Sequence, residues 1–438
     1  MSTSDDVRTT EAPLTLGEAP PPTLGLRDTF GLWANLGVSL LLPVAAVFVV
    51  LPGRPLGVTL AAIVVGAVIG SALLGLVAAA GARERVPGMV LLRGLLGRRT
   101  SWLPTAFNLV QCIGWATFEI VIIAEAASRV LDAPRWPFVL AAGVLATAMA
   151  LRPLGVVRLL ARYAVWAALA AVVYLFVQVL AEPLPPLEGG GATSFWTAAD
   201  IVIALPVSWL PLAADYTRHA RTARAAGVGA GAGYGLATVA MFTLGVLALA
   251  AYSSGGLDVI DALLAVPLGA LAVLVLVTVE LDEAFANVYS TAVSAQNVVA
   301  RLDRRVLAVA VGGVATLLAL SLDVVAYEPF LFLIGAVFVP LAGVLLVAYW
   351  LTPRGGWDTS DTAPARPLYL LPWLTGFVAY QLTLPTYFPG PGAGWTAWWG
   401  ARQADLGIDP ANGWSASLVG LAVAVVLTLP VALAARRR

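Results

Sequence analysis

The chain has almost none of the residues on which hydrolytic and redox enzymes depend. Its 438 residues include one cysteine, Cys112, and one histidine, His219, and all 25 basic residues are arginine. A single cysteine excludes a disulfide framework and a cysteine-based metal site. The HExxH, GxSxG and GxxxxGK[ST] patterns of zinc proteases, serine hydrolases and P-loop ATPases are also missing. We therefore expect no enzymatic activity, no cofactor and no ATP-driven transport within this chain.

Charge is scarce as well. Only 11% of the residues are charged, 60% are hydrophobic, and the mean hydropathy is +0.89. A soluble domain carries about 25% charged residues, so the composition indicates an all-α polytopic membrane protein whose partner is the lipid bilayer. Formal net charge is zero and no basic stripe with interleaved aromatics is present, so nucleic acid is not expected as a partner.

Apolar segments recur along the chain, most of them near the roughly 20 residues that a helix needs to cross a bilayer. We predict twelve transmembrane helices, at residues 30–51, 57–80, 103–130, 137–152, 159–181, 197–213, 229–252, 264–295, 306–323, 328–350, 367–387 and 415–435. Residues 253–263 are expected to form a short segment before the eighth helix. Residues 1–26, rich in Ser, Thr, Pro and acids, predict a disordered cytoplasmic tail.

Arginine gives the orientation. With the N-terminus inside, 21 of the 25 arginines fall on inner segments, and only Arg54, Arg129, Arg135 and Arg402 fall outside. This asymmetry satisfies the positive-inside rule and predicts that both termini are cytoplasmic. The lack of lysine is typical of a GC-rich genome. We expect a multi-pass protein of a bacterial plasma (inner) membrane.

Helix-breaking residues gather in two of the twelve segments. Gly37 and Pro43 interrupt the first, and Pro206 and Pro211 interrupt the sixth. The two segments are equivalent if helices 1–5 and 6–10 are repeats of opposite topology, and interrupted helices in matching positions indicate a binding site near the bilayer midplane. Membrane helices also tolerate such residues without any functional role, so it is the matching positions that favour a site.

Several acidic residues lie inside apolar segments. Glu119 follows Trp115 by one helical turn, and Glu280, Glu283 and Asn287 share a face of the eighth helix, with Asp282 pointing to one side. A carboxylate in hydrocarbon costs at least a few kcal/mol and usually serves a substrate, an ion or a proton. An indole beside a carboxyl group can stack on a flat, nitrogen-rich ring and pair with its nitrogens.

Two other interpretations of these acids stay open. Trp115 and Glu119 could be a packing tryptophan and a buried structural acid. The eighth helix could also end at Val279, which would leave Glu280 and Glu283 at the inner membrane surface, where a membrane-embedded enzyme would need them. The inner end of the sixth helix holds Asp215 and Arg218, which could brace a cytoplasmic gate or only mark the interface. His219, in the loop that follows, is expected to be solvated.

Several segments resemble the nucleobase:cation symporter-1 family, whose members include purine and cytosine permeases. They are Val86–Arg93 and Leu96–Pro104 before the third helix, Gly114-Trp115 with Glu119 in it, Ala214–Arg218 after the sixth, and Phe285–Ser290 in the eighth. The resemblance implies a LeuT-like 5+5 inverted repeat plus two C-terminal helices. The transport core then covers residues 27–350, with repeats at about 27–181 and 197–350, and residues 351–438 hold the two added helices.

The resemblance also implies cation-coupled symport of a small nitrogen heterocycle. It places substrate contacts on Trp115, Glu119 and Asn287. In the sixth helix it adds Pro206 and Ser208, with Trp209 as an alternative source of the aromatic ring. The first-helix region of Asn35 and the acceptor Glu283 complete the predicted set. Glu119 stands where the family has glutamine, and a carboxyl group pairs well with an aminopyrimidine. The chain therefore looks most like the hydroxymethylpyrimidine (thiamine precursor) transporter branch, with cytosine or a hydantoin-like nucleobase analogue as alternatives.

The coupling ion is left open between sodium and a proton. The family's sodium site falls on the carbonyls near Asn35 and Gly37 and on Thr278, Leu281 and Asp282. Leu281 has no side-chain oxygen to offer sodium, while Asp282 could bind sodium or carry a proton. No other metal is expected, and the sequence does not distinguish a monomer from an oligomer.

Overall fold

The computed structural model describes residues 21–152, 164–253, 256–322, 327–352, 356–388 and 392–436. This part of the chain is helical, and its one isolated β-bridge joins Leu24 to Ala220. Most of the predicted tail and the start of the predicted fifth helix lie outside the described residues.

The helices of the first half of the chain include the described apolar segments that were predicted and two short helices, at residues 88–91 and 93–96, that were not. They are α2 (Leu26–Leu36), α3 (Leu41–Val44), α4 (Ala46–Val49), α5 (Leu56–Glu84), α6 (Gly88–Leu91), α7 (Arg93–Leu96), α8 (Trp102–Leu131), α9 (Arg135–Leu151), α11 (Ala164–Leu180), α12 (Phe195–Ser208) and α13 (Ala213–Thr217).

The second half continues in the same way. It contains α14 (Ala223–Tyr252), α15 (Val259–Ala265), α16 (Gly269–Ala295), α17 (Arg304–Ala319), α18 (Tyr327–Leu346), the π-helix η2 (Val347–Leu351), the 3₁₀ turn η3 (Pro367–Tyr369), α19 (Leu370–Thr383), α20 (Ala393–Asp405) and α21 (Ala416–Arg436).

The eighth predicted helix begins later than expected, and it continues past Val279, where the alternative interpretation ended it. α16 begins at Gly269, not at residue 264, because Leu268 adopts a left-handed backbone conformation with φ of 53°. The helix then runs without interruption to Ala295, and Glu280 to Glu283 lie near its middle, where Glu280 is fully buried. The alternative in which the helix ends at Val279 and leaves the acids at the membrane surface is therefore wrong.

Both expected interruptions are present. α2 and the α3–α4 pair are bent by 48° at residues 37–40, and α12 is separated from α13 by residues 209–212. Proline removes a backbone donor and clashes with the preceding turn, so Pro211 accounts for the end of α12 at Ser208. In the described residues, five helices are by themselves long and apolar enough to cross a membrane, or six if the bent pair is counted as one span. The total of twelve spans stays a prediction.

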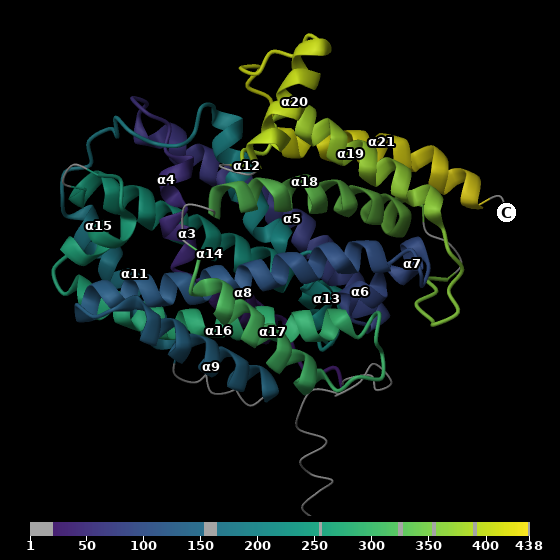
Figure 1. The fold of residues 1–438 in the computed structure, drawn as a ribbon, viewed down its shortest axis with the longest axis horizontal. Coiled ribbons are helices and arrows are strands. Elements are labelled where there is room, and N and C mark those ends of the chain that lie inside the picture. Colours follow the sequence, from purple (N-terminus) through teal and green to yellow (C-terminus); the bar gives the residue numbers. More distant parts are fainter. Residues whose placement is uncertain are drawn as a thin grey trace, which may run out of the picture.

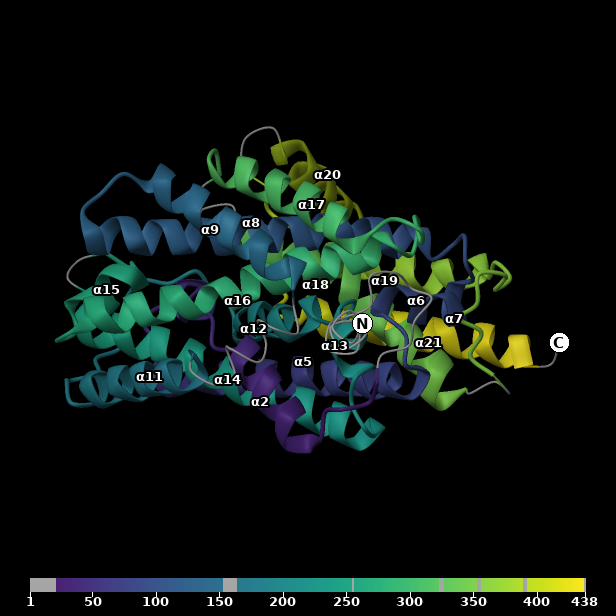
Figure 2. The same ribbon diagram turned by 90° about the horizontal axis from the view of Figure 1, so that it is seen from below.

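Two groups of helices make up the body of the protein. In one, α5 and α14 pack together, α2 packs on α14, and α12 packs on α5. In the other, α8, α9, α16 and α17 pack on one another. Seen from below, α8, α9 and α17 lie on one side and α2, α5, α11 and α14 on the other, with α12 and α16 between them (Figure 2). Each group takes equivalent helices from both predicted repeats, and the broken helices lie where the groups meet.

The remaining helices surround this body. α18 packs against α12 and α21, and α19 packs against α21. Figure 1 shows α18, α19 and α21 along one flank, with α20 standing out from the bundle, while α6 and α7 lie at the end where the chain terminates and α15 lies at the opposite end. Small residues allow close packing inside the body: a Cβ added to Gly75 of α5 would lie 2.7 Å from the Gly227 carbonyl oxygen of α14.

Candidate functional site

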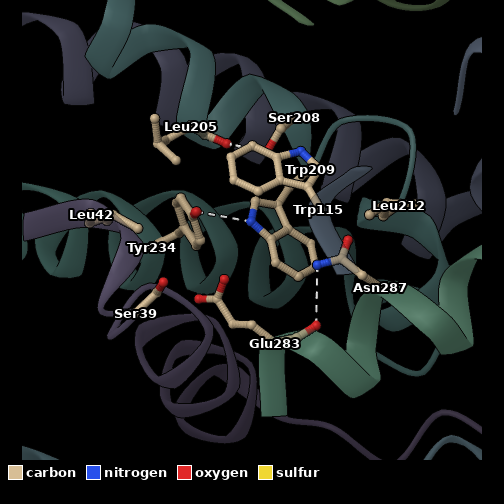
Figure 3. A pocket seen from close by; sticks show the side chains of 10 residues that line it. All are labelled: Ser39, Leu42, Trp115, Leu205, Ser208, Trp209, Leu212, Tyr234, Glu283 and Asn287. Carbon is tan, nitrogen blue, oxygen red and sulfur yellow. Dashed lines mark hydrogen bonds between the residues drawn. The ribbon is translucent and has the colours of Figure 1, made fainter. Parts of the chain in front are cut away.

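A cavity lies where the two helix breaks meet α8, α14 and α16. Its empty volume is about 280 Å³, and it is lined by Ser39, Leu42, Trp115, Leu205, Ser208, Trp209, Leu212, Tyr234, Glu283 and Asn287 (Figure 3). Five of the predicted substrate contacts are in this set: Trp115, Ser208, Trp209, Glu283 and Asn287. An interior cavity at the breaks of two helices is the location that the sequence predicts for the site.

Two indoles form the aromatic part of the cavity wall, and other rings fix both. Trp209 donates its Nε1–H to the Tyr234 hydroxyl over 2.9 Å, and the ring of Trp33 meets it edge-on with centroids 5.6 Å apart. Trp115 meets Tyr327 and Phe330 edge-on at 5.8 and 5.3 Å. The indoles are therefore held in place before any ligand enters.

Polar groups of the cavity come from the second break and from α16. The Ser208 hydroxyl donates to the Leu205 carbonyl at 2.6 Å, and the Ser208 carbonyl accepts from Gln111 Nε2 at 2.8 Å. The Asn287 carboxamide donates to the Glu283 carbonyl at 3.1 Å. In Figure 3 the Glu283 carboxyl and the Asn287 carboxamide lie beside the indole rings. A flat ligand between them would meet both a stacking face and a hydrogen-bonding edge.

Glu283, and not Glu119, is the carboxyl group that lines the cavity. Glu119 is completely buried and is absent from the lining residues. Its carboxyl group faces those of Glu280 and Glu283 at hydrogen-bonding range, and neither of its oxygens receives a hydrogen bond from a protein N–H or O–H. Glu119 thus lies behind the cavity wall, in contact with Glu283, which faces the cavity.

Two carboxyl groups of α16 bind the broken first helix. Glu280 accepts from the Ser39 hydroxyl at 2.8 Å and from the backbone N–H of Leu40, and Asp282 accepts from the Asn35 side-chain amide. These bonds satisfy polar groups that the break exposes. The described residues contain no ion pair that involves Glu119, Glu280, Asp282 or Glu283.

The positions expected for sodium do not come together. Thr278 is exposed and donates its hydroxyl to the Leu274 carbonyl at 2.8 Å. Leu281 has no oxygen in its side chain. Asn35 and Asp282 meet, and the carbonyls near Asn35 and Gly37 lie at the break of the first helix. Thr278 and Leu281 therefore leave the eighth-helix half of the family's sodium site without two of its side-chain oxygens.

Pro206 faces away from the cavity. A Cβ added to Gly70 would lie 3.0 Å from the Pro206 ring, so this proline packs against α5, and it is not among the lining residues. The ring that the sixth helix supplies to the cavity wall is Trp209.

Asp215 and Arg218 are both buried but do not form the expected ion pair. The Asp215 carboxylate accepts from the Gly88 N–H at 2.9 Å, while the Arg218 guanidinium points at the Asp215 carbonyl and the Tyr289 hydroxyl. The pair therefore fastens α6 and α16 to α13. A Cβ on Gly88 would lie 1.8 Å from the Pro211 carbonyl oxygen, so only glycine allows this approach.

His219 is not solvated, as its loop position suggested. Its side chain is 8% exposed, its carbonyl accepts from the N–H groups of Thr23 and Leu24 at 2.9 Å, and burial, followed by the charge of Arg218, lowers the pKa of His219 to about 3. The imidazole is therefore neutral at physiological pH and is no proton relay.

Four residues of the site were not predicted from the sequence: Trp33, Ser39, Gln111 and Tyr234. Gln111 precedes Trp115 by one turn, so a search for polar residues in register with Trp115 would have found it. Ser39 lies within the predicted break. Trp33 and Tyr234 carry no such signal, because an aromatic residue in an apolar segment is typical of any membrane helix.

Residues 23–366 match the family model described as permease for cytosine/purines, uracil, thiamine, allantoin. This covers more than half of the chain. The chain belongs to this permease family. It is accordingly a multi-pass membrane transporter and not an enzyme, as the missing catalytic motifs predicted. No curated protein matches the chain by sequence.

Solved structures confirm the fold class. Mhp1, a nucleobase-cation-symport-1 family transporter solved in a closed conformation with bromovinylhydantoin bound, has 17% sequence identity and a TM-score of 0.73, covering 97% of this chain and 94% of its own. A manganese transporter of Eremococcus coleocola has 13% identity and a TM-score of 0.59, covering 98% and 99%. A Na⁺-coupled sialic acid symporter has 9% identity and a TM-score of 0.64, covering 98% and 93%. The LeuT-like architecture of the permease is therefore correct.

Proposed function

We propose that this permease is a cation-coupled symporter that imports a small aminopyrimidine such as hydroxymethylpyrimidine. Cytosine, also an aminopyrimidine, or a hydantoin-like nucleobase analogue is the alternative. The observation that carries the proposal is the cavity in which Trp115 and Trp209 lie beside the Glu283 carboxyl and the Asn287 carboxamide. We place the protein in a bacterial inner membrane with both termini in the cytoplasm.

The chemistry of the cavity supports a flat, nitrogen-rich ligand. An aminopyrimidine offers a ring nitrogen next to an exocyclic amine, and a carboxyl group can pair with both at once. The indoles supply stacking faces, which favour any planar ring. Mhp1, with a hydantoin bound, is similar in fold.

The structure changes one part of the expected recognition. Because Glu119 does not line the cavity, we assign the pairing with the heterocycle to Glu283 and Asn287. Trp115 and Trp209 are the stacking residues, and Ser208 completes the polar edge. A contact between Glu119 and the substrate is not part of this proposal.

Thermal stabilisation of the purified protein tests the substrate class. A ligand that binds the folded state raises the apparent melting temperature by mass action. We expect a concentration-dependent rise with hydroxymethylpyrimidine or cytosine and none with uracil, which lacks the exocyclic amine. Absence of any rise with the aminopyrimidines, in protein shown to be folded and monodisperse, would rule out this substrate class.

A further inference from the structure

We propose that the cation coupled to transport is a proton, held by the cluster of Glu119, Glu280 and Glu283, with Glu283 as the residue that exchanges it with the cavity. This inference rests on the proposed symport function and goes beyond it by naming the ion and its site. It also accounts for the failure of the sodium positions to come together.

The first observation is the contact between the carboxyl groups themselves. Glu119 of α8 faces Glu280 and Glu283 of α16 at hydrogen-bonding range. Two carboxylates at such a distance repel each other, whereas a carboxylic acid and a carboxylate attract through a short O–H···O bond. No described ion pair involves the cluster. The arrangement is therefore stable only when protons are present between these oxygens.

The second observation is the isolation of Glu119. The residue is completely buried, both of its oxygens lack a protein donor, and they point at the other two acids. An ionised carboxylate without donors or a counter-ion is costly in a membrane interior. Glu119 must therefore be the proton-carrying member that donates to a neighbour.

The three acids differ in their surroundings, which assigns their roles. Glu280 accepts from the Ser39 hydroxyl and the Leu40 N–H, so its oxygens already have donors from the broken first helix. Glu283 lines the cavity and is the member with a route to water or substrate. Glu119 and Glu283 therefore hold the protons of the cluster.

Among the described residues, the other titratable groups around the cluster carry no positive charge. Asp282 lies on α16 and binds Asn35, and the phenols of Tyr234 on α14 and Tyr327 on α18 are the remaining ones. In the described residues no group of three His, Cys, Asp or Glu side chains is arranged to hold a metal ion. A proton is the cation that needs no further ligands.

The proton balance of one cycle is simple. A proton from the outer solution binds the Glu283 carboxylate while the cavity is open outward, and substrate enters beside it. The closed state carries both. When the cavity opens inward, Glu283 hydrates and releases its proton to the cytoplasm with the substrate. One proton crosses per substrate, and no covalent bond other than O–H changes.

Infrared spectroscopy of the reconstituted full chain tests the protons without any substrate. A protonated carboxyl group has a carbonyl stretch that shifts in D₂O. We expect this band in the wild type at neutral pH, and we expect each of Glu119→Gln and Glu283→Gln to lose about half of it. The matched control is Glu125→Gln, on the same helix as Glu119 but bound to Arg129 at 3.0 Å, and it should keep the full band. Absence of the band in the wild type, or its loss on adding sodium chloride, would overturn the proposal.

Transport in proteoliposomes separates this proposal from the proposed substrate. With radiolabelled cytosine or hydroxymethylpyrimidine, an interior more alkaline by one pH unit should raise accumulation up to about tenfold, since one pH unit equals about 1.4 kcal/mol per proton. Glu119→Gln, which removes the proton donor of the cluster, should abolish this rise, whereas Glu125→Gln, outside the cluster, should keep it. A rise driven by a sodium gradient alone would overturn the proton assignment. Absence of uptake with the infrared band intact would instead contradict the substrate.

Discussion

Trp115 is the side chain on which ligand binding should depend most. It lines the cavity, and its ring is held edge-on by Tyr327 and Phe330. Stacking of a base on an aromatic side chain contributes about 1–3 kcal/mol. We expect Trp115→Ala to weaken binding of the aminopyrimidine by about 10- to 100-fold, as measured by the ligand dependence of the melting temperature.

Trp102 provides a matched control for this change. It lies on the same helix, and it is 42% exposed and outside the cavity lining. Trp102→Ala should leave the affinity within about twofold of the wild type. Equal losses in the two variants would mean that the truncation acts through the fold and not through the site.

His219 makes folding stability depend on pH. Burial lowers its pKa to about 3, whereas an unfolded histidine has a pKa of about 6.5. Between these values the unfolded chain binds the extra proton, so stability falls as pH falls through 6.5 and continues to fall to about pH 3. At pH 5 this residue should cost about 2 kcal/mol relative to pH 7.

A variant isolates this contribution. His219→Gln has no group that titrates in this range, so its melting temperature should fall less than that of the wild type between pH 7 and pH 5. Subtracting the change in melting temperature of the variant from that of the wild type cancels the contribution of every other titrating group. Parallel curves would show that His219 is protonated in the folded protein.

The site residues could be predicted from the sequence only in part. Residue spacing placed Trp115 and Glu119 on one face of α8, and Glu280, Glu283 and Asn287 on one face of α16. It could not give the rotation of α8 about its own axis, which packing against α16 and α17 determines. That rotation puts Trp115 in the cavity wall and Glu119 behind it, so the carboxyl group that faces the cavity is that of Glu283.

At the scale of helices, Asp200 fastens the C-terminal helix to the core. Its buried carboxyl accepts from the Ser415 hydroxyl at 2.5 Å and the Ala416 N–H at 2.7 Å, at the start of α21. We expect Asp200→Ala to lower the free energy of unfolding by about 1–3 kcal/mol, because buried donors lose their partner. Thermal denaturation measures this as a reduced melting temperature.

Two variants make this prediction specific. Asp200→Asn keeps one acceptor oxygen and should lose less stability than Asp200→Ala. Asp405→Ala removes an acid that is 59% exposed beside Arg402, and it should leave the melting temperature unchanged. If Asp200→Ala proves as stable as the wild type, the cap does not hold α21 in place.

Helix breaks were the most predictable elements, since they follow from local chemistry. Gly37, Pro43 and Pro211 weaken the helices directly. The start of α16 was predicted five residues early because Leu268 adopts a left-handed conformation, for which leucine has no preference. α15 packs against α16 next to that turn, and the local sequence does not predict such tertiary contacts.

At the scale of the whole molecule, hydrogen bonds join α6 and α7 to the end of α16 and to residues 356–366 at one end of the protein. Arg93 Nε donates to Asn297 at 2.7 Å, at the end of α16, and Arg93 Nη1 donates to Asp361 at 2.7 Å. The Trp357 indole donates to the Leu91 carbonyl at 2.8 Å. Arg93 of α7 thus bonds both to the end of the helix that carries the acidic cluster and to the segment of residues 356–366.

We call Arg93, Asn297 and Asp361 the clasp, because their bonds lie between elements of the two helix groups. α8 and α16 belong to one group, and α6 contacts α5 and α13 of the other. Alternating access requires the groups to separate at one end while they close at the other. Breaking the clasp should therefore favour the conformation that is open at the end holding α6 and α7.

Cys112 reports that opening, because it is the one cysteine of the chain and is fully buried. We expect Arg93→Ala to raise the rate at which a membrane-permeant maleimide labels Cys112 by about tenfold, which is the shift that about 1.4 kcal/mol produces in a two-state equilibrium. Arg99→Ala is the control, because Arg99 is exposed near the clasp and takes no part in it, and its labelling rate should match the wild type. An aminopyrimidine that stabilises the closed state should slow labelling in Arg93→Ala. Equal rates in all three proteins would mean that the clasp is only structural and that the gate lies elsewhere.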